Sequence, residues 1–188
     1  MRKKSHISLA AFLVRHVSNE EFKSHKKLFC LASIFPDCKF SFLTKKHAFQ
    51  DTFEEIKERI TNLSSQSYGE VNGKRRYVVE LSEIMHYLAD YFTFPHNDTY
   101  QGSIKEHCIY EGELKRKLRS YVKSSNAIMQ KDKYVPNYNV EDILAYIKES
   151  HGEYLSKQRS VEEDCDYIVR ITYQVMEAIL LCKERQVA

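Results

Sequence analysis

The sequence predicts an all-helical protein, on three grounds. The 188 residues include only 5 glycines and 3 prolines, so few positions interrupt regular structure. Lysine, glutamate, leucine and isoleucine, which favour helices, are plentiful. Apolar side chains also recur at the spacing of one helical face. This length is sufficient for a hydrophobic core, and we expect residues 1–188 to form a single domain of about seven helices.

Charge and cysteine content narrow the function classes. The net charge of +3 is too small to indicate nucleic-acid binding by itself. The five cysteines are odd in number and scattered, so we expect free thiols in a reducing compartment.

The first residues mimic a signal peptide, but their apolar run is short and no typical cleavage site follows. No segment is long enough to cross a membrane. We therefore expect a cytoplasmic protein that keeps its first helix.

Two helices are expected in the N-terminal part. The first spans residues 5–17, with Ser5 as its N-cap and apolar residues along one face. The second begins near Asn19 and ends before Pro36, because proline disfavours helix in the residue before it. Apolar residues follow this turn, and we interpret them as core packing, with contact to lipid as the alternative: Phe40, Phe42 and Leu43.

Two further helices are expected before the middle of the chain. A third helix over 44–63 would place His47 and Asp51 four residues apart on one face. A polar loop over 64–76 follows it. A fourth helix is expected over 77–92.

Three helices are expected in the C-terminal part. A long helix over 103–129 has a basic amphipathic stretch at 115–123. A solvated face explains that stretch, and transient contact with an anionic membrane surface is the alternative. After a loop over 131–139, two helices over 140–155 and 161–184 close the chain.

The strongest chemical signal lies between residues 85 and 111. His86 and Asp90 are four residues apart, so they share one face of a helix, and His107 and Glu111 repeat that spacing. Between the two pairs, His96 follows a proline that breaks the helix. Imidazole and carboxylate groups suit zinc and other divalent metals. Two such pairs joined by a Pro-His corner indicate a site for more than one metal ion: His86, Asp90, His96, His107 and Glu111.

These residues and several before them resemble the bacterial zinc-dependent phospholipase C family, which is related to the fungal single-strand nucleases. The resemblance covers about residues 5–111, and no motif beyond about residue 118 matches. Its motifs are Ser5-His6, Ser33-Ile34-Phe35-Pro36-Asp37, Lys46-His47, His86-Tyr87-Leu88-Ala89-Asp90-Tyr91-Phe92, Pro95-His96-Asn97 and Glu106-His107-Cys108-Ile109-Tyr110-Glu111.

The resemblance implies an all-α fold around two to three zinc ions. By this resemblance, one ion would be held by Asp37, His47, His86 and Asp90. A second would be held by His96, His107 and Glu111. A third would be held by His6, Asp90 and the backbone of the N-terminal residue. Family members use a tryptophan there, and this chain has none. Because only backbone atoms bind, we expect the amine and carbonyl of Met1 to serve.

The family cleaves phosphodiesters, and the clustered ligands suit that chemistry. Divalent ions generate hydroxide near neutral pH and stabilise the charge that builds on a phosphoryl group. We expect a metal-dependent hydrolase of phosphodiesters, with phospholipid as the substrate class and a metal-bound water as nucleophile. Asp37 is the candidate general base, with a purely ligating role as the alternative. Choline specificity is not implied, because Cys38 stands where choline-binding members have an aromatic residue.

Two other functions remain open at this point. A single-strand nuclease of the same fold would need stacking aromatics and a basic track beside the metals, and the modest net charge disfavours it. A non-catalytic metal-binding module would keep the ligands and close the open coordination positions.

Several neighbouring residues have weaker interpretations. Three could support the ligands, with ordinary core or surface packing as the alternative: Tyr87, Tyr91 and Asp51. Three histidines without a place in the pattern are interpreted as surface residues: His16, His25 and His151. Two cysteines beside proposed ligands are interpreted as packing residues: Cys38 and Cys108.

Overall fold

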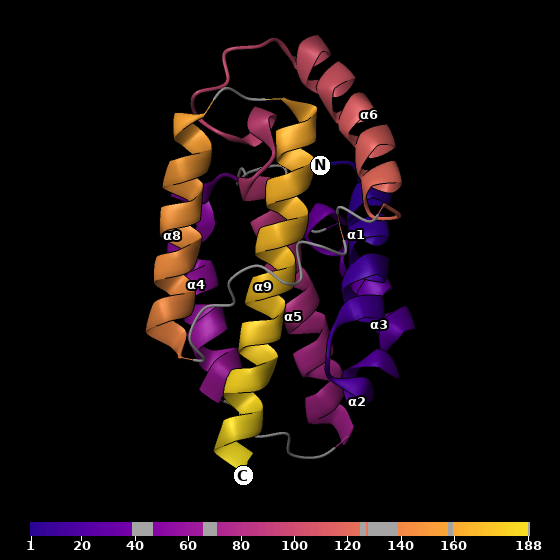
Figure 1. The fold of residues 1–188 in the computed structure, drawn as a ribbon, viewed down its shortest axis with the longest axis vertical. Helices are drawn as coiled ribbons and strands as arrows, with labels where there is room; N and C mark the ends of the chain where they lie inside the picture. Colours follow the sequence, from indigo (N-terminus) through magenta and orange to yellow (C-terminus); the bar gives the residue numbers. More distant parts are fainter. Residues whose placement is uncertain (39–46, 66–70, 125–126, 128–138, 158–159, 188) are drawn as a thin grey trace.

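A computed structural model of the chain describes residues 1–38, 47–65, 71–124, 127, 139–157 and 160–187 (Figure 1). Within these ranges every regular element is helical and no strand occurs. Seven α-helices of seven residues or more are present, together with the four-residue α2 and two short 3₁₀ turns. The predicted all-α class is therefore confirmed. The predicted packing of Phe40, Phe42 and Leu43 lies outside the described residues.

The N-terminal helices differ from the prediction at one cap. Helix α1 (Lys3–His16) begins after Arg2, and the Ser5 hydroxyl is buried inside its first turn without a hydrogen-bond partner among the described residues. The prediction that Ser5 caps the helix is therefore wrong. The chain starts its helix two residues earlier, and its first amide groups face the Arg2 carbonyl.

The predicted second helix is divided into α2 (Glu20–Lys23) and α3 (Lys26–Ala32). Phe22 and Phe29 are both buried, and their ring centroids lie 5.3 Å apart. A straight helix would separate residues seven apart by about 10 Å along its axis. The break between the two helices therefore allows the two rings to pack edge to face.

Helix α4 (Phe49–Ser65) begins after His47, so His47 and Asp51 do not share a helix as predicted. Asp51 lies in the first turn of α4 and is exposed, where an acidic side chain interacts favourably with the helix dipole. His47 precedes the helix and is buried. The non-helical backbone at His47 therefore lets the two side chains face opposite environments.

Helix α5 (Val71–Tyr91) begins six residues before the predicted start and includes Gly73. The predicted loop over 64–76 is therefore wrong at 64–65, which belong to α4, and at 71–76, which belong to α5; residues 66–70 lie outside the described residues. A glycine inside a helix costs about 1 kcal/mol. The buried Tyr77 and Leu81 in the following turns anchor the helix and offset that cost.

The remaining elements are η1 (Pro36–Cys38), η3 (Phe94–His96), α6 (Ile104–Tyr121), α8 (Val140–Ser156) and α9 (Val161–Val187). A reciprocal capping box between Ser103 and Glu106 fixes the start of α6. Helix α6 ends at Tyr121, earlier than the predicted residue 129, in a turn that continues to Ser124.

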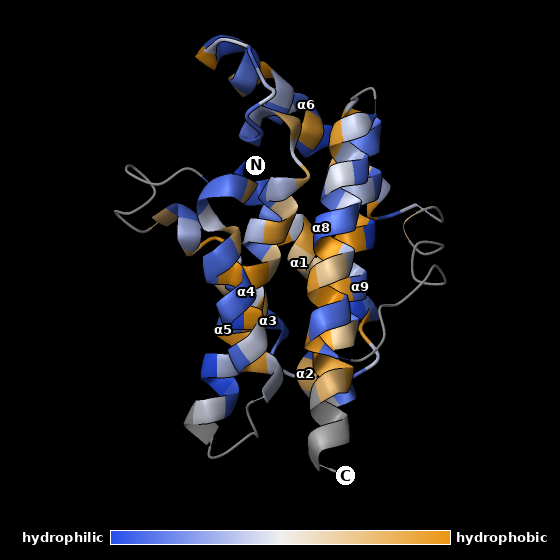
Figure 2. Cartoon of the chain, turned by 90° about the vertical axis from the view of Figure 1, so that its left-hand side faces the viewer, coloured by the Kyte–Doolittle hydropathy of each residue, from blue (hydrophilic) through white to orange (hydrophobic). Residues whose placement is uncertain are grey.

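Helix α9 is the element against which most others pack. It runs almost the full length of the molecule and contacts α1, α4, α5, α6 and α8 (Figure 1). Hydrophilic and hydrophobic residues share the same helices, as expected for amphipathic elements around a common core (Figure 2). No helix in the described ranges combines the length and apolar character that crossing a bilayer requires.

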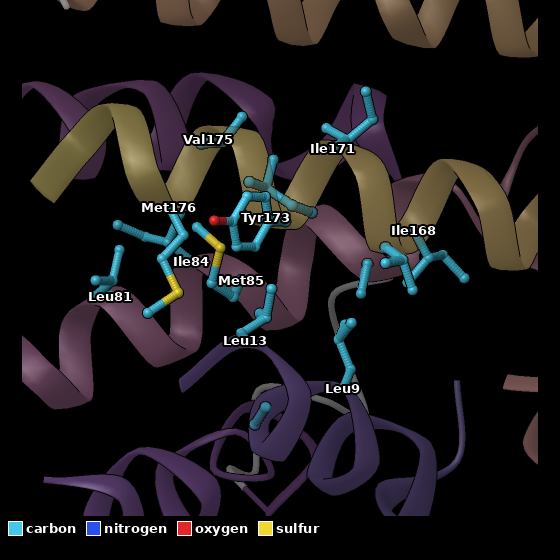
Figure 3. Close-up of a cluster of buried hydrophobic side chains, with 14 of the residues drawn as sticks. Leu9, Leu13, Leu81, Ile84, Met85, Ile168, Ile171, Tyr173, Val175 and Met176 are labelled. Carbon is cyan, nitrogen blue, oxygen red and sulfur yellow. The ribbon is translucent and has the colours of Figure 1, made fainter. Parts of the chain in front are cut away.

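The centre of the core lies between α1, α5 and α9 (Figure 3). Each of these helices contributes apolar side chains that are almost completely buried. The labelled members are Leu9, Leu13, Leu81, Ile84, Met85, Ile168, Ile171, Tyr173, Val175 and Met176.

Leu13→Ala should lower the free energy of unfolding by roughly 2–5 kcal/mol, because the missing methyl groups leave a cavity in a tightly packed core. Leu13 is 0 % exposed. Urea unfolding followed by circular dichroism in the presence of a chelator measures the change. Ile109→Ala on α6 is the control, because Ile109 is 61 % exposed. Equal destabilisation by both variants would contradict this description of the core.

Candidate metal centre

The carboxylate of Asp90 lies at the centre of the site and is completely buried. Helix α5 places Asp90 one turn after His86, and Oδ2 lies 3.3 Å from His86 Nε2. The same oxygen is 3.1 Å from His47 Nδ1. Oδ1 lies 3.4 Å from His6 Nε2 and 2.6 Å from the Met1 amine. One carboxylate thus contacts groups from α1, α5 and the segment before α4.

The turn η1 brings Asp37 to the same cluster. Asp37 Oδ1 lies 3.6 Å from His86 Nε2 and 3.9 Å from His47 Nδ1. Two sets of donor atoms, each within 4.8 Å of one another, overlap at His86: His6 with Asp37 and His86, and His47 with His86 and Asp90. We call these five residues the inner group.

A second set of donors, the outer group, consists of His96, His107 and Glu111. Helix α6 places His107 one turn before Glu111, and His107 Nε2 lies 3.2 Å from Glu111 Oε1. His96 comes from η3, and its Nε2 lies 3.3 Å from the same oxygen. The side chain of His107 is 34 % exposed, whereas that of Asp90 is 0 % exposed. The site therefore extends from the core to the surface at α6.

The amine of Met1 lies between the two groups. It is 2.6 Å from Asp90 Oδ1, 3.0 Å from His96 Nε2 and 3.3 Å from Glu111 Oε1. Arg2 Nη2 donates a hydrogen bond of 2.8 Å to the Cys108 carbonyl on α6. This contact holds the start of the chain against the helix that carries the outer group.

The surroundings shift the pKa values of the three carboxylates of the site in different directions. Burial alone would raise the pKa of Asp90, but the Met1 ammonium and His96 hold it well below its usual range. Burial likewise opposes ionisation of Glu111, but hydrogen bonds from His107 and His96 lower its pKa. Burial raises the pKa of Asp37, despite the opposing influence of His86. Asp37 is thus the most basic carboxylate of the three.

Two imidazoles of the site, those of His6 and His96, are held in the form that binds metals. Burial lowers the pKa of His6 to about 3, and burial also lowers the pKa of His96. Both rings are therefore neutral near pH 7, with a lone pair available for a metal. For the Met1 amine, burial favours the neutral form, but Asp90 and Glu111 together raise its pKa.

The surroundings of His6 give a further reason to expect a metal site. His6 is 1 % exposed, and neither of its ring nitrogens makes a hydrogen bond within the described part of the chain. Its ring stacks on that of His86, with the centroids 3.7 Å apart. Buried polar atoms are almost always hydrogen-bonded, and Nε2 has only the longer ion-pair contact of 3.4 Å to Asp90 Oδ1. A cation bound beside the ring would satisfy it, so this arrangement favours a metal site.

The orientation of His86 depends on a backbone group that the sequence analysis did not assign. His86 Nδ1 donates to the Ser33 carbonyl at 2.8 Å, which turns Nε2 toward Asp90 and toward His47 Nδ1, 3.1 Å away. Hydrogen bonds of this kind fix the tautomer of metal-binding histidines. Ser33 lies in the motif that ends at Asp37, but a pattern of side chains does not reveal the role of a backbone carbonyl oxygen.

The residues with weaker interpretations lie in different environments. The Tyr87 ring is 4.8 Å from that of His47, whereas the Tyr91 hydroxyl pairs with Thr52 at 2.8 Å. Asp51 is exposed on α4, in agreement with the surface alternative. Cys38 and Cys108 are exposed, so their interpretation as packing residues is wrong.

The prediction of a surface position is also wrong for His151, which is 4 % exposed, whereas His16 and His25 are partly buried. His151 lies four residues after the buried Ile147 and three before the buried Tyr154 on α8. That spacing marks the apolar face of a helix and was the available signal.

One comparison identifies the family of the chain. A family model described as zinc dependent phospholipase C matches residues 5–161, beyond the limit near residue 111 set by the motifs. No curated protein and no solved structure matches the chain. The match covers most of the sequence and includes every side chain of the inner and outer groups. The chain therefore belongs to the zinc-dependent phospholipase C family.

Proposed function

We propose that this chain is a zinc-dependent hydrolase that cleaves the phosphodiester bond of a phospholipid. Family membership indicates a metal-dependent, phospholipase-like function. The observation that supports the finer proposal is the convergence of imidazole and carboxylate donors from separate segments on the buried Asp90 carboxylate. Such a donor set suits zinc.

The proposed ligands hold two to three ions. One ion takes its donors from the inner group without His6, and a second takes its donors from the outer group. The Met1 backbone with His6 and Asp90 supplies the donors for the third. When bound, the ions would lower the pKa of a water that acts as nucleophile and stabilise the charge that builds on the phosphoryl group. The side-chain ligands are His6, Asp37, His47, His86, Asp90, His96, His107 and Glu111.

Asp37 is the proposed general base. Its pKa is raised by burial, whereas the pKa values of Asp90 and Glu111 are lowered. Carboxylates whose environments shift their pKa values in opposite directions commonly take different roles in catalysis. Asp37 would accept the proton of the attacking water, and the other two carboxylates would stay ionised as ligands.

The purified protein should contain two to three divalent ions per chain, because donors for at least two ions are already assembled. Metal analysis with and without a chelator, together with a substrate panel, tests this. Removal of the metal should abolish phospholipid hydrolysis, and added zinc should restore it. A chain that takes up at most one ion contradicts the proposal. Cleavage of single-stranded DNA alone would favour the nuclease alternative, and metal without hydrolysis would favour the non-catalytic module.

Asp90→Asn should reduce zinc affinity and hydrolysis together, while the helical circular dichroism is largely kept. Loss of a residue that only supports a ligand costs about 10–100-fold, and removal of a carboxylate shared by several donors should cost more. Asp51→Asn is the matched control, because Asp51 is exposed on α4. Equal zinc binding and turnover by Asp90→Asn and the wild-type chain would show that the site is wrongly assigned.

A peptide extension before Met1 should remove one ion and lower activity without unfolding the chain. The Met1 amine is buried against Asp90, so an added residue both converts the amine to an amide and needs space that the site lacks. The same extension placed after Ala188 is the control. If both extended forms and the chain that starts at Met1 bind equal numbers of ions, Met1 is not a ligand.

A further inference from the structure

Asp164 is a buried carboxylate near the start of α9, outside the inner and outer groups. It is 0 % exposed and accepts three hydrogen bonds. Oδ2 accepts from the backbone N–H of Phe94 at 3.0 Å and from the Tyr110 hydroxyl at 2.9 Å. Oδ1 accepts from the Tyr154 hydroxyl at 2.7 Å. The family match ends at residue 161, so the match does not include Asp164.

These hydrogen bonds reach both segments that carry the outer group. Phe94 lies two residues before His96 in the turn η3. Tyr110 directly precedes Glu111 on α6. A single side-chain oxygen therefore connects the turn that carries His96 to the helix that carries Glu111.

The other side of the same turn has a separate anchor on α8. His151 Nε2 donates to Asn97 Oδ1 at 2.9 Å, and the ring of His151 stacks on Phe49 with the centroids 4.1 Å apart. Asn97 Nδ2 donates to the carbonyl of Thr93 at 3.0 Å. His96 is thus held between an anchor from α9 on one side and an anchor from α8 on the other.

The chemistry of Asp164 favours a positioning role over a contribution to stability. No salt bridge joins Asp164 to a cationic group within the described residues. Its charge is compensated by hydrogen bonds from neutral donors and by its place in the first turn of α9, where the helix dipole favours an acidic side chain. Burial raises the pKa of Asp164 to about 6, despite those hydrogen bonds. A buried carboxylate without a cationic partner weakens the folded state unless its hydrogen bonds compensate.

We propose that Asp164 is a positioning residue that sets His96 against Glu111 and so raises the affinity of the outer group for its metal ion. The proposal rests on the proposed metal-binding function. His96 belongs to a turn of only three residues, and its position therefore depends on the groups that hold the turn. Its ring nitrogen must lie close to the Glu111 oxygen, now 3.3 Å away, for both to bind one ion.

The first test compares Asp164→Leu with Asp164→Asn. Leucine keeps the approximate volume but removes every acceptor, so one of the bound zinc ions should bind about tenfold or more weakly. Asparagine keeps one oxygen for Phe94 and Tyr110, and should retain most of the affinity. Asp166→Leu is the matched control, because Asp166 accepts from the Tyr121 hydroxyl, at the end of α6 farthest from the outer group. Titration against a chelator of known affinity measures each ion.

If Asp164→Leu does not fold, two less disruptive tyrosine variants test the positioning role. Tyr110→Phe and Tyr121→Phe each remove one hydroxyl that donates to an aspartate on α9 at 2.9 Å. Only Tyr110→Phe should weaken the binding of an ion. The absorption spectrum of the cobalt-substituted protein reports any change in coordination, independently of hydrolysis.

The outcomes separate this proposal from the proposed function. If the wild-type chain binds no zinc, both are wrong. If the wild-type chain binds zinc and both Asp164→Leu and Tyr110→Phe bind every ion equally well, only the positioning role is wrong. Equal losses in the Tyr110→Phe and Tyr121→Phe variants would likewise overturn it, because the effect would then be a general one.

Discussion

The burial of the Asp90 carboxylate is the interaction on which the rest of the site depends. A completely buried carboxylate is unfavourable unless positive or hydrogen-bonding groups surround it. Here the Met1 ammonium lies at 2.6 Å, and the rings of four histidines approach from α1, α5, η3 and the segment before α4. The same low-dielectric surroundings that make this charge costly also make it a strong partner for a cation. The segments that carry these donors therefore converge on a single acidic group.

The scaffold divides into a part that supplies donors and a part that supports them. Helices α1, α5 and α6, with the turns η1 and η3, carry most of the proposed ligands. Helices α8 and α9 carry none of the residues of the inner and outer groups, yet α9 contacts α1, α4, α5 and α6. The polar anchors His151 and Asp164 lie on the faces of α8 and α9 that pack inward. Helices α8 and α9 thus support a site whose proposed ligands come from earlier segments of the chain.

Local patterns predicted the features that depend on neighbouring residues. The spacing of His86 with Asp90 and of His107 with Glu111 required only helical periodicity, and both pairs lie on α5 and α6. The false pair of His47 and Asp51 has the same spacing, but burial of His47 against Asp90 decided the start of α4. Contacts across the chain left no such signal: the bond from Phe94 to Asp164 spans 70 residues, and that from His86 to Ser33 ends on a backbone oxygen.

The difference in exposure between the two groups has a kinetic consequence. Water and small chelators can reach the partly exposed His107 without any movement of the helices. The side chains of His86 and Asp90 are 0 % exposed and that of Asp37 is 9 % exposed, so an ion in the inner group has a narrower route to solvent than an ion in the outer group. Two ions of similar affinity would then exchange on very different timescales, with the one at α6 leaving first. The ions that remain in a partly loaded protein would in that case reflect the rates at which the ions dissociate, and not their relative affinities.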